Sequence, residues 1–184
     1  VGYDNPKTSA DGLMFNDQTD MFNGALDRYN WKLLGKREMY IPYNSTRIVQ
    51  PDASYDRLIR KGHINPEFAR YELHRVWVVE ATLKPGLRHA FGRRVFYVDE
   101  DSWSIAAVDC YDGRGQLWRF QEAHLSTFPF VPVTTGSPEV HYDLPSGRYF
   151  VTGSFAGDAY PDFGIELEDS YFRPQTLASR KLKR

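Results

Sequence analysis

Cysteine is almost absent from this chain. The single residue, Cys110, leaves no partner for a disulfide within the chain, so cysteine usage does not identify a redox compartment. Cys110 follows Ala106 and Val108 in a strand-like pattern, and no histidine or basic residue stands in an obvious activating position. We therefore expect a buried, unreactive thiol rather than a nucleophile.

An excess of charge of either sign is also lacking. The chain has 23 Lys and Arg residues against 24 Asp and Glu residues, a net charge of −1. This balance favours neither a polyanion nor a membrane surface, and we predict no nucleic-acid partner. The one basic run, at 180–184, is interpreted as a solvated C-terminus. No apolar stretch approaches the roughly 20 residues of a membrane-spanning helix.

Catalytic and metal-binding motifs are missing as well. The five histidines show no ligand spacing, and the sequence has no nucleophile elbow and no glycine-rich phosphate loop. Glu72 and His74 share a strand face and could bind a metal with a third ligand, but a polar pair facing solvent is the preferred interpretation. We predict no catalytic residues, no metal site and no cofactor, and hence a protein that is not an enzyme.

Aromatic residues, by contrast, are abundant at 15% of the chain. Four apolar runs stand in the middle of the chain, at 71–83, 87–98, 103–111 and 116–127, and very short turns rich in Asp, Gly and Pro separate them. Such turns leave no room for helical crossovers, so the runs predict a four-stranded antiparallel meander. The fold class is therefore mainly β, with few short helices.

The rest of the chain adds less regular structure to this meander. Residues 28–43 predict a strand that is bulged near Gly35, and 139–144 with 148–155 predict a hairpin around Pro145-Ser146-Gly147. We expect loops at 1–28, 43–66, 128–138 and in the turn-rich 157–164, with a short helix at 55–60. A length of 184 residues suits a single domain, 1–184.

Turn lengths predict which side chains share a face, because alternate residues of a strand point to opposite sides. If residues 85–86 form a two-residue turn and 99–102 a four-residue turn, one face collects three of the four tryptophans. Its members would be Leu73, Arg75, Trp77, Val79, Ala81, Arg94, Phe96, Val98, Trp103, Ile105, Ala107, Asp109, Trp118 and Phe120. The opposite face would hold Glu72, His74, Val76, Val78, Glu80, Arg93, Val95, Tyr97, Ala106, Val108, Cys110, Leu117, Arg119 and Gln121. A turn of odd length would reverse the later strands.

This aromatic face has two interpretations. It could be a hydrophobic core beneath a lid, or a concave pocket for an apolar ligand, and the two are compatible. Arg75 and Arg94 could meet an anionic head group, or pair with Asp109 and nearby carboxylates. The candidate ligand-binding residues are Leu73, Arg75, Trp77, Val79, Arg94, Phe96, Trp103, Ile105, Trp118 and Phe120.

Several runs resemble the DUF1329 family of Gram-negative bacteria. They are 71–83 (YELHRVWVVEATL), 94–103 (RVFYVDEDSW), 111–118 (YDGRGQLW), 20–24 (DMFNG) and 29–33 (YNWKL). The resemblance implies a relative of the lipoprotein-carrier superfamily that includes LolA, LolB and RseB. The implied fold is an unclosed antiparallel half-barrel whose concave face takes acyl chains. Members are exported and longer, so this chain would be the C-terminal part, with a missing N-terminal segment completing the sheet.

The function implied is that of a periplasmic or outer-membrane-associated protein that binds or carries a hydrophobic, lipid-like ligand or a lipoprotein acyl chain. The alternative is a non-enzymatic interaction module that docks on an envelope transporter or an outer-membrane protein. An enzyme acting on a lipid or glycan is the least favoured class, because the resemblance brings no catalytic residues.

Overall fold

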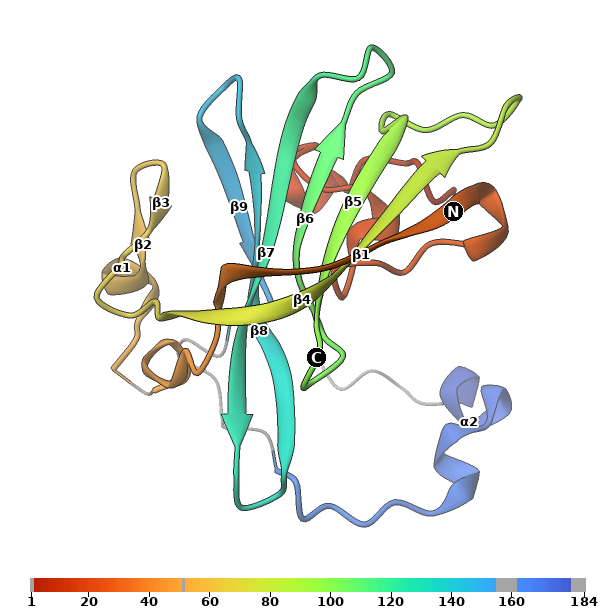
Figure 1. The fold of residues 1–184 in the computed structure, drawn as a ribbon. Helices are drawn as coiled ribbons and strands as arrows, with labels where there is room; N and C mark the ends of the chain where they lie inside the picture. The colour runs from red at the N-terminus through yellow and green to blue at the C-terminus, as the bar shows by residue number, and fades with distance from the viewer. Residues whose placement is uncertain (1, 51, 155–161, 180–184) are drawn as a thin grey trace.

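The centre of the molecule is one open antiparallel sheet of seven strands in the order β1-β4-β5-β6-β7-β8-β9 (Figure 1). The computed structural model describes the whole chain except residues 1, 51, 155–161 and 180–184. The strands are β1 (Tyr29–Pro42), β4 (Tyr71–Leu83), β5 (Arg93–Asp99), β6 (Ile105–Tyr111), β7 (Leu117–Phe128), β8 (Val133–Asp143) and β9 (Arg148–Thr152). The prediction of an unclosed, mainly β antiparallel meander is confirmed.

The sheet is strongly twisted, so that β1 and β4 pass across β7 (Figure 1). The register between β1 and β4 shifts between Leu33 and Gly35, and Gly35 has a φ of 111° that L-residues rarely adopt. This confirms the bulge predicted near Gly35. The bulge lets a long edge strand bend with its neighbour.

Two strand boundaries differ from the prediction. The run predicted at 87–98 becomes a strand only at Arg93, because 84–92 form a loop whose His89 and Phe91 side chains turn inward. The predicted loop at 128–138 is also wrong in part, because β8 begins at Val133 and continues through Gly136 and Pro138. Its bulged pairing with β7 accommodates both residues.

Helices are few and short. They are α1 (Tyr55–Leu58), α2 (Pro174–Ser179) and the 3₁₀ turns η1 (Thr8–Ala10), η2 (Asn16–Gln18), η3 (Leu26–Arg28), η4 (Thr46–Val49) and η5 (Asp169–Phe172). A small hairpin, β2 (Ile59–Arg60) with β3 (His63–Ile64), follows α1. Among the described helices, none combines the length and the apolar character needed to cross a bilayer. The end of the predicted 148–155 strand, most of the 157–164 turn and the basic run 180–184 lie outside the described residues.

Two segments cover the sheet from opposite sides. The N-terminal segment, residues 2–28, packs on the face that carries Phe96, with the Phe22 and Phe96 ring centroids 5.4 Å apart. The other segment, 44–70, buries Ile48, Leu58 and Phe68 against Val140 on β8. Cys110 is fully buried beneath the N-terminal segment, and burial raises the pKa of its thiol to about 12. The expectation of a buried thiol is confirmed, and its lack of reactivity stays a prediction.

One buried ion pair anchors the N-terminal segment to the sheet. Arg94 on β5 is fully buried and its Nη2 donates to the Asp17 carboxylate and, at 2.9 Å, to the Tyr29 hydroxyl. The guanidinium also lies 5.1 to 5.5 Å from the ring centroids of Phe22, Tyr29 and Phe91. An aromatic surround of this kind compensates part of the cost of burying the cation.

His89 completes this anchor from the 84–92 loop. The backbone N–H of Phe91 donates to Nδ1 of His89 at 2.9 Å, so the ring proton sits on Nε2. From there it donates to Asp17, with Nε2 and Oδ2 3.1 Å apart. Asp17 thus links the N-terminal segment, the sheet and the loop.

Removing the cation should destabilise the protein strongly. Arg94→Met leaves the Asp17 carboxylate buried without its charge partner, and we expect a loss of about 3–5 kcal/mol in the free energy of unfolding. Urea unfolding followed by circular dichroism measures it. Adding Asp17→Asn should recover part of the loss. The exposed pair Arg114–Asp112 offers the control Arg114→Met, expected to change stability by under ~1 kcal/mol. A loss in Arg94→Met no larger than the control's would contradict this role.

The contact of Asp17 with Arg94 and His89 should also make the free energy of unfolding depend on pH. Burial by itself raises the pKa of Asp17, but the His89 hydrogen bond and the Arg94 charge outweigh it, so the folded pKa lies below the ordinary 3.8. A depressed pKa means that Asp17 stabilises the fold above the unfolded value, and that this contribution is lost as the pH falls through the folded value. We expect the free energy of unfolding of Asp17→Asn to fall less steeply below about pH 4 than that of the unmodified chain. Parallel slopes in urea titrations between about pH 5 and 2 would contradict the assignment.

Candidate functional site: an apolar groove and an adjoining acidic pocket

The cross-strand register of three strands builds an aromatic surface, which we call the tryptophan face. Its members on β1, β4 and β5 are Trp31, Leu33, Trp77, Val79, Ala81, Phe96 and Val98. Trp77 pairs with Val98 and Val79 pairs with Phe96, so these side chains point the same way. This is the parity predicted from the turns, although the connecting loop is longer. The observed pairing of β4 with β5 differs from the predicted pairing by an even number of residues, so the same side chains share a face.

An apolar groove lies on this face. It has a volume of about 340 Å³ and its five lining residues, Leu33, Trp77, Val79, Val98 and Trp103, are all apolar. The groove is open, since Leu33 is 60% and Trp103 70% exposed. The Trp77 and Trp103 rings stack with centroids 6.4 Å apart, and the Lys36 ammonium lies 4.1 Å from the centre of the Trp77 ring. Exposed aromatic and aliphatic side chains grouped in this way are typical of a surface that receives an apolar partner.

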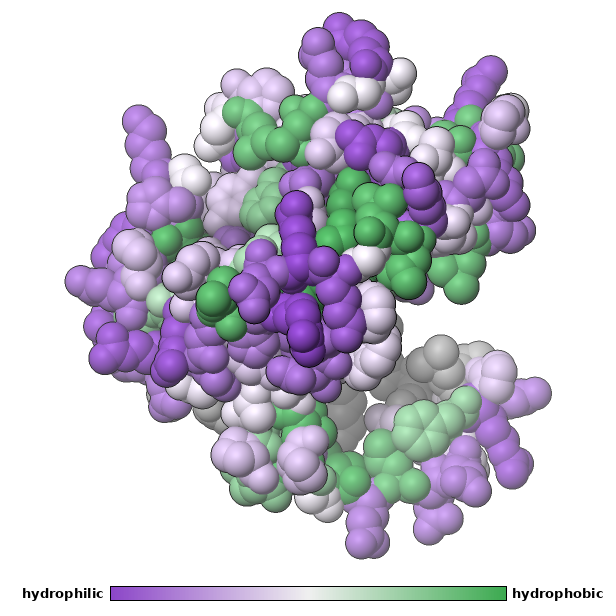
Figure 2. Space-filling view, in the orientation of Figure 1, coloured by the Kyte–Doolittle hydropathy of each residue, from purple (hydrophilic) through white to green (hydrophobic). Residues whose placement is uncertain are grey.

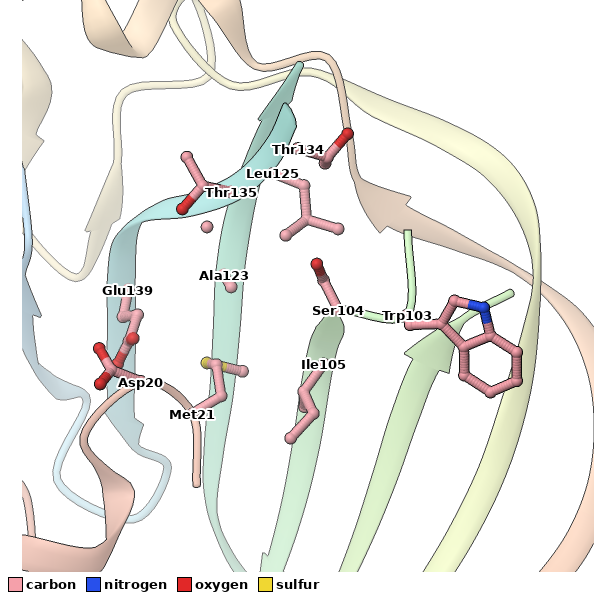
Figure 3. Close-up of a pocket in the computed structure, with 11 residues that line it drawn as sticks. Asp20, Met21, Trp103, Ser104, Ile105, Ala123, Leu125, Thr134, Thr135 and Glu139 are labelled. Atoms are coloured by element: carbon pink, nitrogen blue, oxygen red, sulfur yellow. The ribbon is translucent and has the colours of Figure 1, made fainter. Parts of the chain in front are cut away.

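A second pocket adjoins the groove at Trp103, which lines both (Figure 3). Its volume is about 390 Å³, and Met21, Ile105, Ala123 and Leu125 form its apolar floor. The polar lining consists of Asp20, Ser104, Thr134, Thr135 and Glu139. Figure 3 shows Asp20 and Glu139 at the end of the pocket away from Trp103. The N-terminal segment therefore leaves part of the sheet uncovered, beside Met21.

The turn before β6 places Trp103. Asp99 is fully buried and its Oδ2 accepts hydrogen bonds from the backbone N–H and the hydroxyl of Ser102, at 2.9 and 2.7 Å. The backbone N–H of Trp103 then donates to the Asp99 carbonyl at 3.0 Å, and Trp103 takes a φ of 57°. A large side chain in the left-handed region costs conformational energy. The turn holds it there, at the boundary between groove and pocket.

The predicted ligand-binding residues divide into three groups. Trp77, Val79, Trp103 and Ile105 line the groove or the pocket, and Phe96 packs beside them against Trp31. Leu73 and Arg75 share the tryptophan face but lie further along β4, where Arg75 Nε bonds Glu100 at 2.6 Å. Trp118 lies elsewhere, with its ring packed on Phe15 and Phe91.

The predicted faces are wrong on β6 after Ile105 and on β7 at Arg119, Phe120 and Gln121, whereas Leu117 lies on its predicted face. The register shifts between Tyr97 and Val98, where Ala106 is an extra residue on β6. Ile105 therefore keeps its predicted face, whereas Ala107 and Asp109 lie on the opposite one, and Phe120 with them. The same shift brings four residues predicted for the other side onto the tryptophan face, namely Val108, Cys110, Arg119 and Gln121. A bulge adds one residue to one strand, so it reverses the alternation.

Arg94 does not stand beside an open head-group position. Its side chain is fully buried and bonded to Asp17 and Tyr29. The sequence offered the alternative that it pairs with a nearby carboxylate. The carboxylate is Asp17 rather than Asp109, which accepts a hydrogen bond from Tyr97 at 2.7 Å on the other face.

A cluster of possible metal ligands lies at the start of the Asp99 turn. His74, Asp99 and Asp101 have ligand atoms within 4.8 Å of one another, and Glu72 Oε2 lies 3.5 Å from His74 Nε2. In the structure His74 Nδ1 bonds Asp99 Oδ1 at 2.8 Å, and Asp99 also binds Ser102. These contacts account for the cluster as part of the turn that places Trp103.

Two other pockets occur in segment 44–70. Their volumes are about 430 and 540 Å³, and both are lined by Arg47, Glu67 and Phe68. Charged and polar side chains make up most of the remaining lining. Both are larger than the groove and its adjoining pocket, but they lack the apolar surface that makes the groove a candidate ligand site.

Several site residues were missed from the sequence. Leu33 alternates with Trp31 in the predicted strand, and that pattern could have added it to the aromatic face. Met21 and Asp20 come from a segment without periodicity, and Glu139 from the far side of the β7–β8 bulge. No local pattern brings these residues to the same place.

Comparisons with known proteins agree with this architecture. The model of the family described as "Protein of unknown function (DUF1329)" matches residues 1–178. An uncharacterized protein of Pseudomonas aeruginosa is 50% identical over 179 residues, which cover 96% of this chain and 39% of that protein. The predicted resemblance is confirmed. The chain spans well under half of this relative's length.

Two solved structures are similar. A candidate outer membrane lipoprotein-sorting protein domain from Vibrio parahaemolyticus matches with a TM-score of 0.55 at 11% identity, covering 95% of this chain and 57% of that one. A DUF1329 family protein from Desulfovibrio piger matches with a TM-score of 0.49 at 16% identity, covering 90% of this chain and 53% of that one. The first of these shows a shared fold.

Proposed function

For this chain, which belongs to the DUF1329 family, we propose the binding and carriage of a hydrophobic, lipid-like ligand in the Gram-negative envelope. The observation that supports it is the apolar groove of Leu33, Trp77, Val79, Val98 and Trp103. The fold shared with the Vibrio domain is consistent with such a carrier and with a periplasmic location.

The groove has the physical properties that this function needs. Burying each methylene of an alkyl chain against it would contribute about 0.8 kcal/mol, so a short stretch of chain supplies useful affinity. Because Leu33 and Trp103 are exposed, a ligand can enter and leave without opening the core. A carrier needs binding that is reversible in this way. Among the described residues, no arrangement of nucleophile, base and oxyanion donors faces the groove, so carriage without chemistry is the simpler proposal.

The groove can be tested with an uncharged fluorescent probe, N-phenyl-1-naphthylamine. Leu33→Asp places a carboxylate where the chain would lie, and we expect the affinity for the probe to fall at least about tenfold. Trp103→Ala should also weaken it by removing one wall. Both side chains are mostly exposed, so the fold should survive.

The matched control is Leu117→Asp. Leu117 is also exposed but pairs with Tyr111 on the opposite face of the sheet. We expect this variant to bind the probe with the affinity of the unmodified protein. Equal affinities in Leu33→Asp, Leu117→Asp and the unmodified protein, all folded by circular dichroism, would refute the groove as the ligand site.

The alternative function, an interaction module, has one supporting observation. Among the described strands β1 pairs with β4 alone and stands at the edge of the sheet, and the paired residues Tyr40 on β1 and Leu73 on β4 are more than half exposed. Such an edge can accept a strand from an envelope transporter or an outer-membrane protein.

Native mass spectrometry after gentle purification separates the two proposals. We expect a mass increment of one lipid-like molecule that is lost in Leu33→Asp. A ligand-free mass in both proteins, with an envelope partner captured through the β1 edge, would favour the interaction module instead.

A further inference from the structure

The acidic pocket suggests which kind of amphiphile the groove receives. We infer that the ligand carries an ammonium head group, which binds between Asp20 and Glu139 while its alkyl chain follows the apolar groove. This inference rests on the proposed function and adds the chemistry of the polar end. It differs from the sequence-based expectation that arginines would meet an anionic head group.

The two arginines proposed for an anion are already engaged. Arg94 is fully buried against Asp17, and Arg75 bonds Glu100, which also binds Lys36 with Nζ and Oε2 2.6 Å apart. Neither lines the groove or the acidic pocket. A negative head group would therefore find no free basic side chain among the described residues that line these two spaces.

Of the two carboxylates, Glu139 gives the stronger evidence that the pocket binds a cation. The residue is only 7% exposed, and its Oε2 is buried without a hydrogen-bond partner in the described structure. The nearest basic atom is His141 Nε2, at 3.6 Å, which is beyond hydrogen-bond distance. A buried carboxylate that lacks donors is costly, and a ligand that supplies N–H groups and positive charge would lower that cost.

The geometry joins this polar end to the apolar one. Trp103 lines both spaces, so the pocket that contains Glu139 and Ile105 adjoins the groove at this residue (Figure 3). Asp20 adds a second carboxylate at the same end, and the hydroxyls of Ser104, Thr134 and Thr135 add further acceptors.

Apolar surface is limited to separate patches on the face of the molecule shown in Figure 2. Figure 2 shows hydrophilic side chains over most of the visible surface, with apolar patches separated from one another. A ligand with one charged end and one apolar chain would match the joined pocket and groove better than a broad apolar partner would.

Three ten-carbon probes that differ only in the head group test the inference: decylammonium, decanoate and decanol, each below its aggregation limit at neutral pH. Isothermal titration calorimetry should give decylammonium about tenfold tighter binding than decanoate, which corresponds to ~1.4 kcal/mol. In the double variant Asp20→Asn, Glu139→Gln the ratio should fall to within about twofold, while the affinity for decanol stays unchanged. Asp56→Asn, in α1 and exposed, is the control and should keep the preference.

Each result decides between the two proposals. Equal affinity for decylammonium and decanoate, or a preference that persists in the double variant, would overturn the ammonium site and leave the apolar groove standing. Absence of binding by all three probes would overturn the carrier function itself, and the ammonium site with it.

Discussion

The contact between Arg94 and Asp17 is the constraint on which the rest of the structure depends. It fastens a segment with little regular structure onto the middle of a β-sheet, and His89 and Tyr29 add further hydrogen bonds to the pair. Burying either charge without the other would be costly, so Arg94 and Asp17 stabilise each other in the interior. Their contact therefore fixes the position of the N-terminal segment on the sheet. Met21 and Phe22 follow a few residues later and cover the sheet beside it.

The position of that segment determines the open surface. It covers Cys110 and part of Phe96, and it stops short of Val79, Val98 and Leu125. What stays uncovered is the apolar groove and the acidic pocket, with Trp103 between them. The same residues that complete the core therefore define the walls of the candidate site. A carrier needs this division, because a fully covered sheet would have no room and a bare one would aggregate.

Sequence patterns were most reliable where the chain is regular. The alternation in Tyr71–Leu83 and in 93–98 correctly placed Trp77, Val79, Phe96 and Val98 on one face, even though the turn between the strands was misjudged. Prediction failed at Phe120 because one extra residue, Ala106, reverses the alternation of the β6 residues that follow it, and Phe120 pairs with one of them, Asp109. Nothing in the local composition marks a bulge at this alanine pair, because the bulge is defined by the pairing of β6 with β5, which the sequence of β6 alone does not specify.

The sequence by itself determined the four-strand meander, the bulge at Gly35, the buried cysteine and the aromatic character of one face, because these follow from short-range periodicity and turn chemistry. The family was identified separately, from the resemblance of several runs of sequence. Only the tertiary structure decided which carboxylates accompany that face. Asp17 and Asp20 belong to the N-terminal segment and Glu139 to β8, distant parts of the sequence without matching patterns, and long-range packing brings the segment onto the sheet. The sign of charge at the site is therefore a property of the folded chain rather than of any motif.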